Sequence, residues 1–82
     1  MNFYDYMIKT YKGAKGPKGD LAHDMSYDSD TFPRNEDGDF KQGYKIISEY
    51  LMRQGACYDC MVTFDDAWDD YVRSERVRLW TS

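Results

Sequence analysis

Residues 39–55 read DFKQGYKIISEYLMRQG, the stretch with the most regular helix pattern in the chain. Its apolar side chains recur at i, i+4, i+7 and i+11, a spacing that places them on one face of an α-helix. They belong to Phe40, Tyr44, Ile47 and Leu51. Asp39 is positioned to cap the N-terminus, Gln42 stands at the capping-box position, and Gly55 follows the C-terminus. The stretch predicts an amphipathic helix that packs against a core.

Segments on both sides of this stretch repeat the helical spacing. Residues 2–12 are predicted to form a helix whose apolar rows hold Phe3, Tyr4, Met7, Ile8 and Tyr11. Asp20 is placed to cap a short helix whose inner residues are Leu21, Ala22 and Met25. Thr63 is the predicted N-cap of a last helix, which the pattern allows to continue to Trp80. The inner face of that helix holds Phe64, Ala67, Trp68, Tyr71 and Val72.

The remaining residues end helices or carry charge. Residues 13–19, GAKGPKG, contain three glycines and a proline and are predicted to be a mobile loop. Residues 73–82 are predicted to be a basic C-terminal tail or an extension of the last helix. Because no long run alternates with period two, we predict an all-α fold, a compact bundle of four to five helices forming one domain over residues 1–82. Its core is predicted to hold Phe3, Tyr44, Ile47, Leu51, Phe64, Trp68 and Tyr71.

Short aromatic motifs give the chain a family resemblance. They are FYDYM at residues 3–7, Leu21-Ala22, Phe32-Pro33, Ile47 with Tyr50-Leu51, and FDDAWDDY at residues 64–71. Their order resembles the YozE-like family of small bacterial proteins, whose fold is similar to that of sterile alpha motif (SAM) domains. The resemblance implies a SAM-like helical fold and no catalytic residues, because the family has no established activity. The chain departs from the family pattern in its glycine–lysine loop, its Cys-x-x-Cys pair and its basic tail.

Charge and composition exclude several classes of protein. The net charge of −4 argues against binding through phosphate contacts, so direct nucleic-acid binding is not expected. No run approaches the ~18 apolar residues of a membrane helix. Residues 1–5 have neither the basic nor the apolar region of a signal peptide. With only two cysteines, the chain is expected to be cytoplasmic and to have no membrane contact.

No complete catalytic or metal-binding set is visible. Cys57 and Cys60 supply two of the four ligands that tetrahedral zinc requires, and His23 could add only a third. We expect the pair to be reduced and metal-free; a redox role and a metal shared between two chains are the alternatives. A helix starting after Thr63 could lower the pKa of these thiols. His23 has no serine or cysteine partner at a catalytic spacing, so an enzyme is not predicted.

Two loop segments suggest known ligand-binding motifs but lack the residue spacing that those motifs require. Residues 13–19 lack the spacing and the preceding strand of a phosphate-binding loop. They are interpreted as a solvated loop, with a contact surface for an acidic partner as the alternative. Residues 35–39, NEDGD, suggest a calcium loop, but with Gly38 at position six the first and last ligands would be Pro33 and Tyr44. We therefore predict no metal and no cofactor.

The candidate binding site is an acidic face on the last helix. Asp65 and Asp66 are expected in its first turn, where the helix dipole favours anions. Asp69 can pair with Arg73 four residues later. No internal contact explains why Asp69 and Asp70 add to the same charge. The candidate protein-binding residues are Asp65, Asp66, Asp69 and Asp70, with Tyr58 beside them; the alternative is an ordinary solvated face.

Two functions fit this surface. The first is a small non-enzymatic protein-interaction module with an unknown protein partner, either monomeric or weakly self-associating. The alternative is a phage-type or mobile-element inhibitor or regulator of a nucleic-acid enzyme, whose acidic face would occupy a basic groove. Both functions use charge complementarity, and the sequence does not name the partner.

Overall fold

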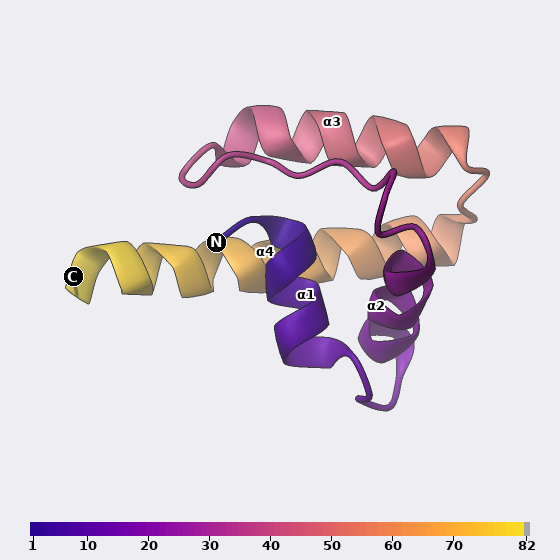
Figure 1. Ribbon diagram of the computed structural model, residues 1–82, viewed down its shortest axis with the longest axis horizontal. Helices are drawn as coiled ribbons and strands as arrows, with labels where there is room; N and C mark the ends of the chain where they lie inside the picture. Colours follow the sequence, from indigo (N-terminus) through magenta and orange to yellow (C-terminus); the bar gives the residue numbers. More distant parts are fainter. Residues whose placement is uncertain (82) are drawn as a thin grey trace.

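The computed structural model describes residues 1–81, apart from the side chains of Leu79 and Thr81. Four helices follow one another: α1 (Phe3–Tyr11), α2 (Pro17–Tyr27), α3 (Phe40–Arg53) and α4 (Tyr58–Thr81). Helix α3 runs antiparallel to α4 along one side, and α1 and α2 pack on another side of α4 (Figure 1). The described part of the chain contains no strand, so the predicted all-α bundle is confirmed. No helix among these residues is both long and apolar enough to span a membrane.

Helix α3 has the ends that its sequence predicts. The Asp39 side chain accepts a hydrogen bond from the backbone N–H of Gln42 at 3.1 Å, as an N-cap should. At the other end Gly55 adopts a positive φ of 82°. Its N–H and that of Ala56 donate to the carbonyls of Met52 and Leu51 at 3.0 and 3.1 Å, which is the Schellman pattern. Local sequence is therefore enough to define this helix.

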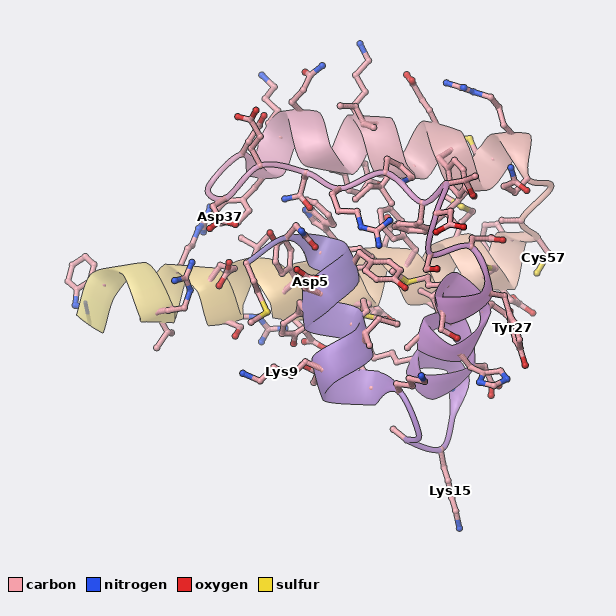
Figure 2. The ribbon with its side chains drawn as sticks, in the orientation of Figure 1. Asp5, Lys9, Lys15, Tyr27, Asp37 and Cys57 are labelled. Carbon is pink, nitrogen blue, oxygen red and sulfur yellow. The ribbon has the colours of Figure 1, made fainter. Side chains whose placement is uncertain are left out.

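Helix α2 begins three residues before the predicted cap at Asp20. Pro17 occupies the first turn, where its missing N–H costs nothing and its fixed φ suits the helix. The prediction that all of residues 13–19 form a loop is therefore wrong: only residues 12–16 connect α1 to α2, with Lys15 pointing outward (Figure 2). Gly19 packs within the helix, and a Cβ there would lie 2.0 Å from the Ala14 carbonyl oxygen.

Helix α4 also begins earlier than predicted, at Tyr58 instead of after Thr63. The Thr63 hydroxyl donates to the Asp59 carbonyl at 3.0 Å, so this side chain satisfies its own hydrogen bond inside the helix and does not cap it. Residues 73–81 extend the helix, and Ser82, the last residue of the predicted tail, lies outside the described residues. These C-terminal turns project past the ends of α1 and α3 (Figure 1).

Aromatic rings fill the core where α1, α3 and α4 meet. The ring of Phe3 lies 5.0 Å from that of Trp68, 5.4 Å from Phe64 and 5.5 Å from Tyr71, measured between centroids. All seven residues predicted for the core are buried except one. Tyr44 stacks on Phe64 at 5.4 Å but remains 37% exposed. Tyr6 is buried although it lies off the predicted stripe, because its ring packs against that of Tyr71 in α4 at 5.4 Å.

A buried polar network fastens the N-terminus and the α2–α3 connection to α4. The Asn35 side chain accepts from the Phe3 N–H at 2.8 Å and donates to the Tyr71 hydroxyl at 2.9 Å. That hydroxyl in turn donates to the Met1 carbonyl at 2.7 Å. The Met1 ammonium pairs with the carboxylate of Glu75, which is only 3% exposed. The network fixes which side of α4 remains uncovered.

Candidate functional site

Four of the five residues proposed from sequence as a binding surface lie together on the uncovered side of α4. Tyr58, Asp65 and Asp69 are separated by seven and four residues, so they lie along one line of the helix. Asp66 lies beside them, and all four side chains are exposed, Tyr58 to 81%. Because α4 starts at Tyr58, Asp65 and Asp66 lie beyond its first turn. The helix dipole stabilises anions only within that first turn. The dipole explanation for these two carboxylates is therefore wrong.

Asp70 does not belong to this surface. Its carboxylate accepts from Lys18 Nζ at 2.5 Å and from the Tyr11 hydroxyl at 2.9 Å. The Arg73 guanidinium pairs with its other oxygen at 2.9 Å. Asp70 thus joins α1, α2 and α4, which explains its charge by internal contacts and corrects its assignment to the binding face. The sequence could not reveal this role because Lys18 appeared to lie in a loop.

Asp70→Asn is expected to lower the free energy of unfolding by about 1–2 kcal/mol, because Lys18 and Arg73 lose their ion pairs with the carboxylate and the Tyr11 hydroxyl loses a charged acceptor. Asp66→Asn is the matched control, since Asp66 is exposed and makes none of these contacts, and its effect should stay within about 0.5 kcal/mol. Chemical denaturation of both variants measures the difference. Equal stability of the two variants would show that the Asp70 contacts contribute nothing.

Two carboxylates make folding sensitive to acid. The hydrogen bond from Lys18 holds the pKa of Asp70 below its ordinary value, against the opposing effect of burial. Burial alone would raise the pKa of Glu75, but hydrogen bonds from Arg78 and the Met1 ammonium outweigh it and leave this pKa lowered. A carboxylate with a lowered folded-state pKa stabilises the fold above its unfolded pKa. That stabilisation is lost as the pH falls through the folded-state pKa.

The free energy of unfolding is therefore expected to be nearly constant between about pH 5 and pH 7 and to fall below about pH 4. Asp70→Asn removes one of the two titrating groups, so its decline should be shallower than that of the wild type. Denaturant titrations at several pH values provide the measurement. A variant with the wild-type acid slope would show that Asp70 is not one of the responsible groups.

The other three aspartates of the proposed surface differ in the contacts that their carboxylates make. Asp65 accepts a hydrogen bond from the Tyr44 hydroxyl at 2.6 Å, which raises the pKa of Tyr44. Asp66 and Asp69 form no ion pair with any side chain described in residues 1–81. The predicted Asp69–Arg73 pair is not formed, because the Arg73 guanidinium turns to Asp70 and reaches only the backbone carbonyl of Asp69, at 3.5 Å.

The same side of α4 becomes basic and apolar toward its C-terminus. Arg73, Arg76 and Trp80 are exposed, Trp80 to 90%. A groove of about 510 Å³ runs here between α3 and α4; it is lined by Phe40, Lys41, Trp68, Asp69, Val72, Arg73 and Arg76. This part was predicted as a basic tail or an extension of the last helix, but it was not assigned to the binding face. Its helical spacing relative to the aspartates was the signal that could have placed it on the binding face.

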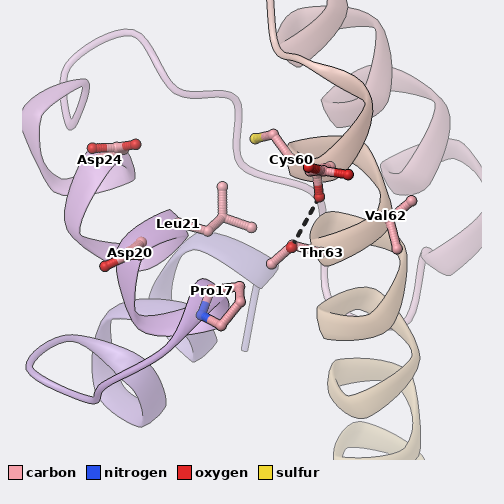
Figure 3. A pocket seen from close by; sticks show the side chains of 8 residues that line it. Pro17, Asp20, Leu21, Asp24, Cys60, Val62 and Thr63 are labelled. Atoms are coloured by element: carbon pink, nitrogen blue, oxygen red, sulfur yellow. Dashed lines mark hydrogen bonds between the residues drawn. The ribbon is translucent and has the colours of Figure 1, made fainter.

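A second groove of about 480 Å³ lies between α2 and the first turns of α4 (Figure 3). Pro17, Leu21 and Val62 form its apolar part, and its carboxylates come from Asp20, Asp24 and Asp59. No group of three or more histidine, cysteine or acidic side chains in the described residues is arranged to hold a metal ion. The groove therefore offers contact area and negative charge, without a set of ligands.

The cysteines lie at the turn into α4. Cys57 is exposed and points away from the body of the protein (Figure 2), and Cys60 is partly buried in the first turn. Burial raises the pKa of the Cys60 thiol, and the neighbouring Cys57 and Asp24 raise it further. The expected lowering of thiol pKa by the helix is thus wrong for Cys60. His23 contacts Tyr27, with 3.1 Å between its Nε2 and the tyrosine hydroxyl.

Comparison with known proteins agrees with this fold. A family model described as YozE SAM-like fold matches residues 2–73. A UPF0346 protein of Bacillus mycoides is 40% identical over 73 residues, which cover 87% of this chain and 92% of that protein. The UPF0346 protein YozE of Bacillus subtilis is 33% identical over 72 residues, or 85% of this chain and 88% of that protein. No solved structure matches the chain significantly. The family resemblance seen in the aromatic motifs is confirmed, and this chain belongs to the YozE SAM-like family.

Proposed function

We propose that this protein is a non-enzymatic protein-interaction module that uses the exposed side of α4 as its contact surface. The observation that carries the proposal is the uncompensated charge of Asp66 and Asp69, which have no ion-pair partner in residues 1–81. Exposed charge of one sign speeds association with a complementary surface and disfavours other partners. The partner is therefore expected to present basic groups to these carboxylates.

Tyr58 supports the proposal from the N-terminal end of the same surface. It is 81% exposed, so it contributes almost nothing to the core of this protein. Tyrosine offers a large contact area at low entropic cost, which is why it is enriched in binding surfaces. A charged patch with an exposed aromatic side chain beside it has both the means to attract a partner and the means to hold it.

The absence of enzymatic activity and a cytoplasmic location complete the proposal. Catalysis needs an activated nucleophile or a positioned acid or base, and the raised pKa of Cys60 is the opposite of activation. Both cysteines are free, as is usual in a reducing compartment. Neither the fold nor the names of the relatives favours the predicted alternative, an inhibitor of a nucleic-acid enzyme.

The test compares wild type with the double variant Asp66→Asn/Asp69→Asn. Partners captured from a lysate of the native host with the immobilised protein are identified by mass spectrometry and then purified. The variant is expected to bind such a partner about tenfold more slowly at low salt, with a smaller difference at high salt, where screening already weakens attraction. Its melting temperature should stay close to that of wild type, since neither carboxylate has an internal ion pair.

Lys12→Gln/Lys15→Gln is the matched control, because it changes two exposed charges on the connection between α1 and α2. This variant should bind as fast as wild type or faster, since it makes the protein more acidic. If the aspartate variant keeps the wild-type rate and the lysine variant loses binding, the contact surface is the α1–α2 connection and the proposal is wrong.

A further inference from the structure

Six side chains on the exposed side of α4 follow the spacing of a coiled coil. From residue 62 the steps are four, three, four, three and four residues, which keeps the side chains in one stripe along the helix. They are Val62, Asp66, Asp69, Arg73, Arg76 and Trp80, called the α4 seam below. All six are exposed. Any side of an α-helix has this spacing, so the six positions are distinguished by their exposure and by the order of their side chains.

The chemistry of the seam is antisymmetric about its middle. From the N-terminal end it reads apolar, acidic, acidic, basic, basic, apolar. A two-fold axis between Asp69 and Arg73 would place each acid opposite a base and each apolar side chain opposite another. Val62 would face the partner's Trp80, Asp66 the partner's Arg76, and Asp69 the partner's Arg73. Each of these contacts occurs twice, because a two-fold interface repeats every pair.

We infer that the α4 seam binds a second copy of this chain, with the two α4 helices antiparallel. The inference rests on the proposed function, since it uses the same surface, and it names the partner. The basic groups that Asp66 and Asp69 require are present on the protein itself, at the matching positions of the same helix. Arg76 and Trp80 lie beyond the residues 2–73 that match the family, so the seam is not a property that family membership implies.

The shape of the protein permits this pairing. The last turns of α4 project past α1 and α3 (Figure 1), and Trp80 is 90% exposed, so its side chain is accessible to a second α4. From residue 62 to residue 80 the seam is about 27 Å long. Arg73 already binds Asp70, but its side chain is 74% exposed, and a guanidinium has five N–H donors, which leaves some for the partner's Asp69.

Four of the six seam positions are charged, and this sets the expected strength. Exposed ion pairs contribute little individually and are screened by salt, whereas the two Val62–Trp80 contacts bury apolar area. The inferred complex is therefore a weak dimer that forms in the micromolar range and dissociates as salt is added. Sedimentation equilibrium of the wild-type protein from about 1 µM to about 1 mM covers that range.

Reversing the charge at one position of the α4 seam tests the pairing directly. In the homodimer of Asp66→Arg, the introduced arginine faces the partner's Arg76 in two symmetry-related pairs, and in that of Arg76→Asp two aspartates face each other in the same two places. Neither residue makes an ion pair within its own copy among the described residues, so both variants are expected to keep the wild-type melting temperature as monomers. Each variant alone should dimerise about tenfold or more weakly than wild type. An equimolar mixture of the two variants should restore the wild-type affinity. One chain then carries arginine at positions 66 and 76 and the other carries aspartate at both, so each pair across the interface again joins opposite charges.

The outcomes separate this inference from the proposed function. A wild-type protein that stays monomeric up to about 1 mM at low salt overturns the inference. Dimers that survive in both single variants, or a mixture no tighter than its components, overturn the antiparallel seam. If a captured heterologous protein nevertheless loses binding to Asp66→Asn/Asp69→Asn, the proposed function stands and only the identity of the partner is wrong. If Asp66→Asn/Asp69→Asn both dimerises and binds the captured partner as wild type does, the inference and the proposed function are both wrong.

Discussion

Trp68→Ala is expected to lower the free energy of unfolding by about 3–5 kcal/mol, a large part of the stability of a domain this small. The indole is 6% exposed and lies against four aromatic rings, at centroid distances of 5.0 Å to Phe3, 5.1 Å to Tyr71, and 5.9 Å to both Tyr44 and Phe64. Alanine would leave a cavity where α1 and α4 meet, and these rings cannot all close it. The melting temperature should fall by on the order of 15 °C or more, measured by circular dichroism.

Trp80→Ala is the matched control for this prediction. It removes the same side chain from the same helix, but at a position that is 90% exposed. At concentrations too low for the inferred dimer to form, its effect should be within about 0.5 kcal/mol. A Trp68 variant that melts together with the Trp80 variant would mean that the aromatic cluster is not the core.

Asn35→Ala is expected to cost about 2–4 kcal/mol, because it leaves two buried polar groups without their partner. The Phe3 N–H loses its acceptor and the Tyr71 hydroxyl loses a donor. Asn35 is itself 8% exposed, so water does not readily replace it. Thermal or chemical denaturation gives the magnitude.

Asn35→Asp separates the two contacts. The aspartate keeps an acceptor for the Phe3 N–H, but it loses the amide that donates to Tyr71 and adds a negative charge at a position that is only 8% exposed. It should be destabilising at neutral pH and recover as the aspartate is protonated at lower pH. If Asn35→Ala is as stable as wild type, the network is incidental to folding.

The local sequence was sufficient for helices whose own residues define both ends. For α3 the apolar spacing, the Asp39 cap and Gly55 all act within a few residues, and the structure agrees with each. The family motifs were equally readable, because aromatic side chains that meet in one core recur at helical spacing. Local propensity failed at the starts of α2 and α4. Pro17 looked like a helix breaker and acts as a first-turn residue, and Thr63 looked like a cap and lies inside α4.

Gly43 is a further residue that local helix propensity does not explain. Within a helix it costs about 1 kcal/mol relative to alanine, so the sequence offers no reason for it. In the structure a Cβ at this position would lie 2.7 Å from the Cβ of Asn35 and 3.1 Å from the Trp68 ring. The connection between α2 and α3 passes against α3 at this point. The close approach of this connection and of Trp68 therefore explains why position 43 is a glycine.

The sequence by itself determined the all-α class, the family, most of the aromatic core and the exposure of Asp65, Asp66 and Asp69 on one side of the last helix. These depend on spacing along a single helix, which is fixed by 3.6 residues per turn. Tertiary structure alone decided which charges remain free. Asp70 is bound by Lys18 and Tyr11, more than fifty residues away in the chain, while Asp66 and Asp69 are not. Such pairing depends on how α1 and α2 cross α4, and no local rule contains that geometry.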